Sequence, residues 1–340
     1  MERIQNKFEF FNQLAKDLKT ETALHLPTPD LIKLSMISKK YRAFFKPMLD
    51  VRKLLHHVAR GEHDAVKTML EKDINLLFKK GRVTDCSGRT FEHISSFEYA
   101  LWALDKHMWT MVLDCIPQNE AGKKVLVQLL SQYNKVKKEG VSYTLNGRTI
   151  TEKHFNFEKT LIKELQTQVD SIQAPGDKNW DAINKQWREG VGGVQKLLPM
   201  HVVYEYCSDE PFYHIPHIPS PQTKPSKQWL SSPRPKPLKQ FYNTITEKHE
   251  NWFCVDSKLG IAFALYKGSG TGGAVSNYSG WQEASLMGLK LVINELTAVR
   301  GLYEARTTEF IHLESQLEEQ IISINQPQGL SSLIYLMSFC

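Results

Sequence analysis

Apolar residues recur every three or four positions over much of this 340-residue chain. This spacing is the period of a helix that buries one face, so it predicts a mainly helical protein. The clearest example is the stretch 27–45, where the segment Ser38–Arg42 makes the opposite face basic. The apolar face of this stretch comprises Leu31, Leu34, Ile37, Tyr41 and Phe44. Further helices with the same spacing are expected at 4–19, 120–138, 155–172 and 302–324.

The ends of the helix within 27–45 follow from its prolines. Thr28 before Pro29 is typical of an N-cap residue followed by proline at the first helical position. Proline within a helix removes a backbone hydrogen bond, so the helix is expected to stop near Phe45, before Pro47. With the helix at 4–19, it predicts an N-terminal helical hairpin over residues 1–49.

Two further local patterns follow the hairpin. Residues 54–72 predict a helix, a turn at Gly61 and a second helix, and 99–104 and 109–113 predict another pair of helices. Asn146-Gly147, between two alternating runs, predicts a β-hairpin with a type I′ turn over 141–151. One or two more helices are expected within 178–206.

Prolines interrupt the chain between 211 and 240. Eight of them stand between Pro211 and Pro237, a density that excludes a regular helix or a central strand. The segment is therefore expected to be a long loop or a linker. Beyond it, strands are expected at 251–255 and 260–266, a glycine-rich loop at 268–273, and helices at 281–299 and 302–324.

The composition fits a soluble globular protein. Hydrophobic residues make up 41% and charged residues 24% of the chain. The net charge of +6 is spread along the sequence, which does not favour nucleic-acid binding. Five widely spaced cysteines form no CxxC pair, which indicates a reducing compartment and neither a disulfide framework nor a structural zinc site. The chain shows no apolar signal core and no stretch of the roughly 20 apolar residues that span a bilayer.

The stretch 27–45 resembles the second half of an F-box, the helical module that docks a substrate receptor onto the Skp1 subunit of a ubiquitin ligase. The segment 54–72 resembles an ankyrin repeat, and Asp85–Thr90 resembles the turn that opens the next repeat. These resemblances imply an adaptor that binds a host Skp1-like protein and an unknown host protein. The implied partner-binding residues are Pro29, Leu31, Leu34, Ile37 and Tyr41, with Trp102 and Trp109 as anchors in the repeats.

Over roughly 55–300, the chain is similar to largely uncharacterised ankyrin-containing proteins of intracellular bacteria of the Legionella kind. The segments 83–91, 99–109, 141–147 and 197–207 carry this resemblance. Many proteins of the group are presumed to be type IV secretion effectors. The resemblance therefore implies secretion into the host cell cytoplasm and a role in virulence.

An enzymatic alternative and a scaffold alternative stay open. Cys254 or Cys207 with a histidine, such as His201 or His249, could form a thiol-based site. His214 and His217 beside Cys207 could bind zinc, and the loop 268–273 could bind phosphate, but proline spacing and the missing P-loop ending favour plain loops. In the scaffold alternative, the N-terminal hairpin only caps the repeats, with Leu31, Leu34 and Ile37 buried against residues 50–70. Independently of this, the helical spacing of Trp102 and Trp109 favours core positions over exposed anchors.

The sequence thus predicts an α+β protein that is mainly α-helical, and it assigns no cofactor and no metal. An F-box-like hairpin (1–49) leads into degenerate ankyrin-like repeats (50–117). A helical region with one hairpin follows (118–210). A proline-rich segment (211–240) then connects to C-terminal strands and helices (241–340).

Overall fold

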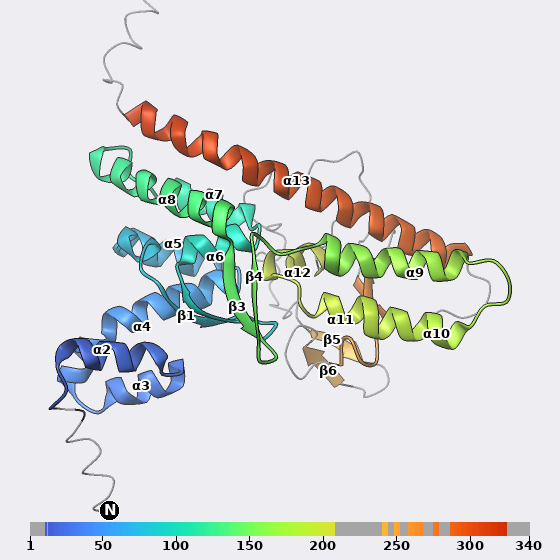
Figure 1. Ribbon diagram of the computed structural model, residues 1–340, viewed down its shortest axis with the longest axis horizontal. Helices are drawn as coiled ribbons and strands as arrows, with labels where there is room; N and C mark the ends of the chain where they lie inside the picture. Colours follow the sequence, from blue (N-terminus) through green and yellow to red (C-terminus); the bar gives the residue numbers. More distant parts are fainter. Residues whose placement is uncertain are drawn as a thin grey trace, which may run out of the picture.

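The computed structural model describes residues 11, 13–207, 240–243, 248–251, 258–267, 275–278 and 286–324. Within these residues the fold is α+β and mainly helical, with a four-stranded antiparallel sheet, which confirms the predicted class. Figure 1 shows the elements in chain order from the N-terminal helices to the long helix α13. The proline-rich segment 211–239, Cys254 and the glycine-rich loop 268–273 lie outside the described residues.

From Lys16 on, the N-terminal part contains the helices α2 (Lys16–His25), α3 (Thr28–Met36) and α4 (Lys39–Ala59). The prediction of a single helix that begins at Thr28 and ends before Pro47 is wrong in two respects. The chain breaks at Ser38, whose extended backbone and side chain cap α4 by accepting from the Tyr41 N–H at 3.1 Å. Pro47 then lies inside α4. Thr28 makes no side-chain cap, because Pro27 occupies the N-cap position of α3.

The next segment alternates helices with two strands. After α4 come α5 (His63–Lys72), the 3-10 helix η1 (Ile74–Leu77), β1 (Gly81–Thr84), β2 (Thr90–Ile94), α6 (Ser96–Trp102) and α7 (Lys106–Asp114). The predicted turn at Gly61 is present, with φ of +67°, and the expected turn at 85–90 joins β1 to β2. Two helix pairs therefore form where the sequence placed them.

Helix α8 (Glu120–Glu139) leads directly into β3 (Val141–Leu145) and β4 (Arg148–Glu152). These strands form the predicted hairpin, and Asn146 and Gly147 both have the positive φ of a type I′ turn. The sheet order is β1-β2-β3-β4, and β2 meets β3 at the pair Thr90–Thr144. The sheet thus joins the helical pairs to the hairpin in one body.

The second half of the described chain begins with the π-helix η2 (Glu158–Ile162). It continues through α9 (Lys163–Gln173), α10 (Trp180–Lys185), the π-helix η3 (Gln186–Val191), α11 (Gly192–Gln195) and α12 (Met200–Cys207). Two short antiparallel pairs follow, β5 (Gln240–Asn243) with β6 (Lys248–Asn251), and β7 (Ala264–Lys267) with β8 (Val275–Tyr278).

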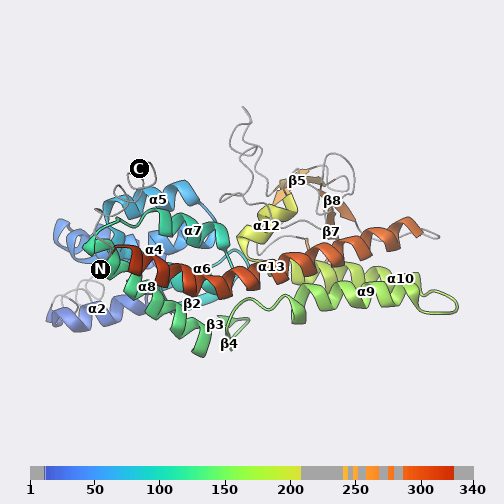
Figure 2. The same cartoon turned by 90° about the horizontal axis from the view of Figure 1, so that it is seen from above.

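The C-terminal helix α13 (Leu286–Ile324) is one helix of 39 residues, so the expected division near residue 300 is wrong. Gly301 lies within α13 and does not end the helix. The predicted apolar face is confirmed, because Phe310, Leu313 and Leu317 are buried and Ile321 packs against the core. Figures 1 and 2 show α13 running along α9 at one end and α8 at the other. It therefore connects both halves of the described chain.

Apolar side chains gather in two separate clusters. The main core extends from α4 through the sheet to α13. A small cluster, called the hairpin cluster below, lies between α2, α3 and the first half of α4 and is built around Ala23, Leu31, Tyr41 and Phe45. Helix α4 contributes to both clusters.

Candidate functional site

The hairpin cluster accounts for part of the predicted partner-binding face. Leu31 is fully buried and Tyr41 is 8% exposed. The Tyr41 ring stacks on Phe45 with 5.8 Å between ring centroids. Leu34 packs against the same cluster, while Pro29 and Ile37 are exposed. The predicted face is therefore split, and most of its apolar residues hold the hairpin together.

A different apolar surface of α3 faces outward. Ile32, Met36 and Ile37 expose 44%, 67% and 48% of their surface. Together they are called the α3 strip below. Ile32 and Met36 are four residues apart and share a helix face, and Ile37 follows as the C-cap residue. Of these three residues, only Ile37 belongs to the face predicted from the sequence. The other two follow a second apolar spacing, Ile32 with Met36, that runs beside the first.

The exposed strip is unusual for the described chain as a whole. Large apolar side chains that are exposed number nine among the described residues, and four of them lie between Leu18 and Ile37. Single exposed apolar residues need no explanation, but a group of them marks an interaction surface. The N-terminal hairpin is therefore the candidate binding surface.

Arg52 fixes the position of the hairpin on α4. Its buried guanidinium donates to the carbonyl oxygens of Ala23 at 3.2 Å, Leu24 at 2.8 Å and Leu26 at 2.6 Å, and to Thr28 Oγ1 at 3.3 Å. The last carbonyls of α2 have no partner within their helix, so a cation with several donors satisfies them well. Burial lowers the pKa of Arg52, with the nearby Arg82 adding to this effect.

Trp102 and Trp109 lie in the main core. Trp102 is fully buried and Trp109 is 2% exposed. The Trp102 indole N–H donates to Glu152 at 3.1 Å, and the Trp109 ring packs edge-on against Phe310. In this conformation neither ring reaches the surface, which matches the alternative that both are core residues.

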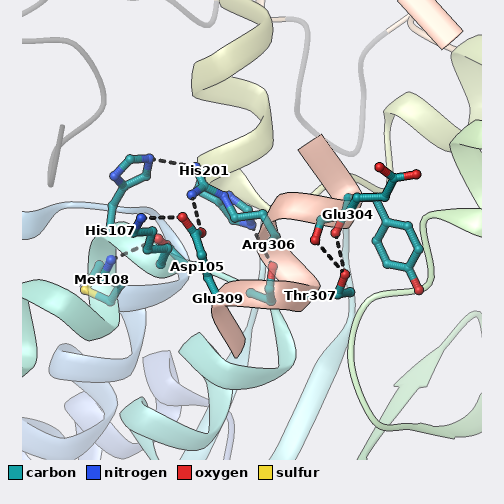
Figure 3. A network of polar contacts seen from close by, with 11 residues as sticks. Asp105, His107, Met108, His201, Glu304, Arg306, Thr307 and Glu309 are labelled. Carbon is teal, nitrogen blue, oxygen red and sulfur yellow. Dashed lines mark hydrogen bonds and ion pairs between the residues drawn. The ribbon is translucent and has the colours of Figure 1, made fainter. Parts of the chain in front are cut away.

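A buried polar junction forms where α7, α12 and α13 meet (Figure 3). Asp105 caps α7 by accepting from the Met108 N–H at 3.0 Å. His107 Nε2 lies 3.0 Å from Arg306 Nη2, and His201 Nε2 lies 2.6 Å from the carbonyl oxygen of Ala103. The cluster of Asp105, His107, His201 and Arg306, all at most 4% exposed, is called the polar junction below.

The geometry of the polar junction defines the protonation of both imidazoles. Arginine has only donors, so His107 Nε2 is an acceptor and its proton lies on Nδ1. A carbonyl only accepts, so His201 Nε2 carries a proton. Burial lowers the pKa of His201 to about 4, although Asp105 opposes this effect. His201 is therefore neutral near neutral pH.

The pKa of Asp105 is lowered, although burial alone would raise it. Burial raises the pKa of this carboxyl, but the imidazoles of His201, His63 and His107 and the Met108 N–H lower it to below its usual value. Glu309 accepts from Arg306 at 2.9 Å and also pairs with Lys106. Arg306, Glu309 and Lys106 are thus paired within the protein, which is typical of a structural site.

Residues 160–317 match a family model described as the CBUA0006 C-terminal domain. The chain is also 32% identical over 280 residues to the uncharacterized protein CBUA0006 of Coxiella burnetii (strain RSA 493 / Nine Mile phase I). That match covers 77% of this chain and 73% of the relative. The chain belongs to the CBUA0006 family. No solved structure matches it.

The matched CBUA0006 domain begins within η2 and ends within α13. His201 and Arg306 lie inside it, whereas Asp105 and His107 precede it. The polar junction therefore connects the family's C-terminal domain to the N-terminal half of the chain. Neither match names an F-box or an ankyrin repeat, so both resemblances stay predictions. The relative does come from an intracellular pathogen.

The predicted thiol site stays a prediction, because Cys254 and the side chain of Cys207 lie outside what the structure describes. His201 Nε2 is engaged by Ala103, and the free thiols among the described side chains are those of Cys86 and Cys115. Burial raises the pKa of Cys115, which disfavours a reactive thiolate. Within the described ranges no set of three or more potential ligands could hold a metal ion. None of the described helices combines the length and hydropathy of a membrane span.

A surface groove of about 480 Å³ lies beside β2 and β3. Its charged groups largely pair with each other or with neighbours. Lys80 contacts Glu98 at 2.6 Å, and Glu92 contacts Arg82 at 3.4 Å. His93 lines this groove, but no cysteine does. The groove therefore offers no thiol–histidine pair for the thiol-based alternative.

Proposed function

We propose that this CBUA0006-family chain is an effector of an intracellular bacterium that acts as a protein-interaction adaptor in the host cytoplasm. The α3 strip docks the N-terminal hairpin onto a Skp1-type subunit of a host ubiquitin ligase. The main body presents a host target to that ligase. The observation that carries this proposal is the exposed α3 strip on a hairpin with its own apolar cluster.

The hairpin is built to present this strip. Leu31 and Tyr41 face inward, so the outer face of α3 is available without unfolding the hairpin. The Arg52 hydrogen bonds hold α2 and the start of α3 against α4. Burial of these three side chains contributes on the order of 1 kcal/mol each to binding, because 44–67% of the surface of each remains to be covered. A surface of this kind suits a helix-packing partner such as Skp1.

The direct test is binding of the full chain to purified Skp1. The variant Ile32→Ala/Met36→Ala/Ile37→Ala removes the α3 strip. The matched control Ile311→Ala/Ile322→Ala removes two side chains of α13 that are 60% and 59% exposed. We expect the strip variant to lose at least about tenfold in affinity while the control retains it. Circular dichroism should show that both remain folded.

Two results would overturn the proposal. One is the absence of Skp1 binding by the unmodified chain. The other is equal Skp1 binding by the strip variant and the unmodified chain. In the scaffold alternative, the hairpin serves only to cover the start of the main body. The strip variant would then leave every interaction of the protein unchanged.

A further inference from the structure

Three cations follow the α3 strip directly in the chain. Lys39, Lys40 and Arg42 are exposed at the start of α4, and the first turn of this helix holds no acidic residue. Among the described residues none of the three forms an ion pair, whereas the neighbouring Lys33 pairs with Asp30 at 3.1 Å. The structure thus pairs Lys33, which lies within the span of the strip, and leaves the three cations after the strip without a counter-charge among the described residues.

The position of these cations on α4 adds to the positive potential. The N-terminal end of a helix carries a partial positive charge, so anionic side chains are favoured there and cations are not. Ser38 caps the helix through its hydroxyl and supplies no negative charge. Three like charges at this end disfavour the free hairpin, and an anionic partner removes the disadvantage.

We infer that the partner of the hairpin presents an apolar surface bordered by carboxylates, which contact Lys39, Lys40 and Arg42 when the α3 strip is covered. This inference rests on the proposed function and specifies the chemistry of the partner's surface. The order in the chain supports it. Met36 and Ile37 precede the Ser38 cap and the cations follow it, so apolar and electrostatic contacts lie side by side.

Electrostatic contacts of this kind make association dependent on salt. Exposed charges are screened over about 10 Å at 0.1 M salt, while apolar contacts are not weakened. We therefore expect Skp1 binding to weaken at least about fivefold between 0.05 and 0.3 M NaCl. The double charge reversal Lys39→Glu/Lys40→Glu should lower affinity about tenfold or more and remove most of the salt dependence. Glutamate near a helix N-terminus is favourable, so this variant should fold at least as well as the unmodified chain.

The matched control is Lys135→Glu/Lys138→Glu, which reverses two exposed lysines near the end of α8. It changes the net charge equally but lies away from the hairpin. If Lys135→Glu/Lys138→Glu weakens Skp1 binding as much as Lys39→Glu/Lys40→Glu does, the effect depends on net charge alone, and the inference is overturned. Binding that needs the α3 strip but ignores salt and the Lys39/Lys40 reversal would also overturn it, while the proposed function would stand.

Two other occupants of the strip give distinct results. If a second copy of the chain covers the strip, light scattering will show that the unmodified chain is a dimer and that the strip variant is a monomer. If residues 1–10 cover it, their deletion will raise Skp1 affinity severalfold. Either result would overturn the acidic partner surface as the occupant. Absence of Skp1 binding at every salt concentration refutes the proposed function itself, and the inference fails with it.

Discussion

Acid should loosen the polar junction, because this junction contains His201, a buried histidine that is neutral near neutral pH. Lowering the pH protonates His201, which is buried and whose pKa in the folded chain is about 4, against 6.5 for a free imidazole. The unfolded chain therefore binds more protons than the folded chain between these two values. Stability from this group is fully present above about pH 6.5 and falls as the pH decreases toward 4.

The size of the effect follows from the two pKa values. The difference of about 2.5 units corresponds to a limit of about 3 kcal/mol. Linkage gives a loss of about 2 kcal/mol on going from about pH 7.5 to pH 5. The carboxylate of Asp105 partly offsets the effect of burial on His201, and the pKa of about 4 already includes this offset. A loss of this size is a large fraction of the stability of an ordinary domain.

Urea unfolding at about pH 7.5 and pH 5 measures this loss, with His201→Gln as the perturbation. Glutamine can still donate to the Ala103 carbonyl but does not titrate. We expect the unmodified chain to lose about 2 kcal/mol more than this variant between the two pH values. The control His312→Gln changes an exposed histidine of α13 and should keep the full pH dependence. Equal pH dependence in the unmodified chain and His201→Gln would refute the reasoning.

Three further substitutions probe the contacts that hold the fold together. Arg52→Met removes the donors to the α2 carbonyls and should cost about 2–4 kcal/mol. Hydrogen exchange should show the opening confined to α2 and α3. The buried side-chain amide of Gln195 donates to the Leu265 carbonyl at 2.7 Å and accepts from the Leu265 N–H at 2.8 Å. Gln195→Leu removes both hydrogen bonds, and urea unfolding should show that the free energy of unfolding falls by about 2–4 kcal/mol. Gly61→Ala places a Cβ at positive φ only 2.7 Å from Tyr204 Cε2, and should lower the thermal midpoint through a cost of about 1–2 kcal/mol.

Local periodicity predicted the elements whose signals are local. The Asn146-Gly147 turn requires positive φ at two adjacent residues, and few sequences other than Asn-Gly provide it at low cost. The apolar face of Phe310, Leu313 and Leu317 was equally visible, because helical spacing reports which side is buried. These predictions depend on residues that are close in the sequence and not on tertiary contacts.

The errors came from contacts that spacing does not encode. Ser38 ends one helix and starts the next, although the apolar spacing continues across it. Pro47 is tolerated within α4, where flanking residues pack into two apolar clusters. Gly301 does not divide α13, because the helix is held along its length by α9 and α8. In each case tertiary packing outweighed local preference.

The site was harder to predict than the fold, for a related reason. Two apolar stripes run along α3, and spacing alone does not say which one is buried. Leu31 faces inward because Tyr41 and Phe45 return to it from α4, a contact made only after the break at Ser38. The stripe with Ile32 and Met36 is then left outside. Long-range polar contacts such as Arg52 to Leu24 or His201 to Ala103 have no sequence signal at all.

Helix α4 determines how a docked partner is held relative to the body. Tyr41 and Phe45 belong to the hairpin cluster, whereas Leu54 and Leu55 belong to the main core, and all four lie on one uninterrupted helix. At 1.5 Å per residue, the span from Tyr41 to Leu54 is about 20 Å. The Arg52 hydrogen bonds prevent the hairpin from swinging about this helix. Under the proposed function, a partner on the α3 strip would therefore be held at a fixed distance and orientation from the main core, as an adaptor that presents a second protein bound to its body requires.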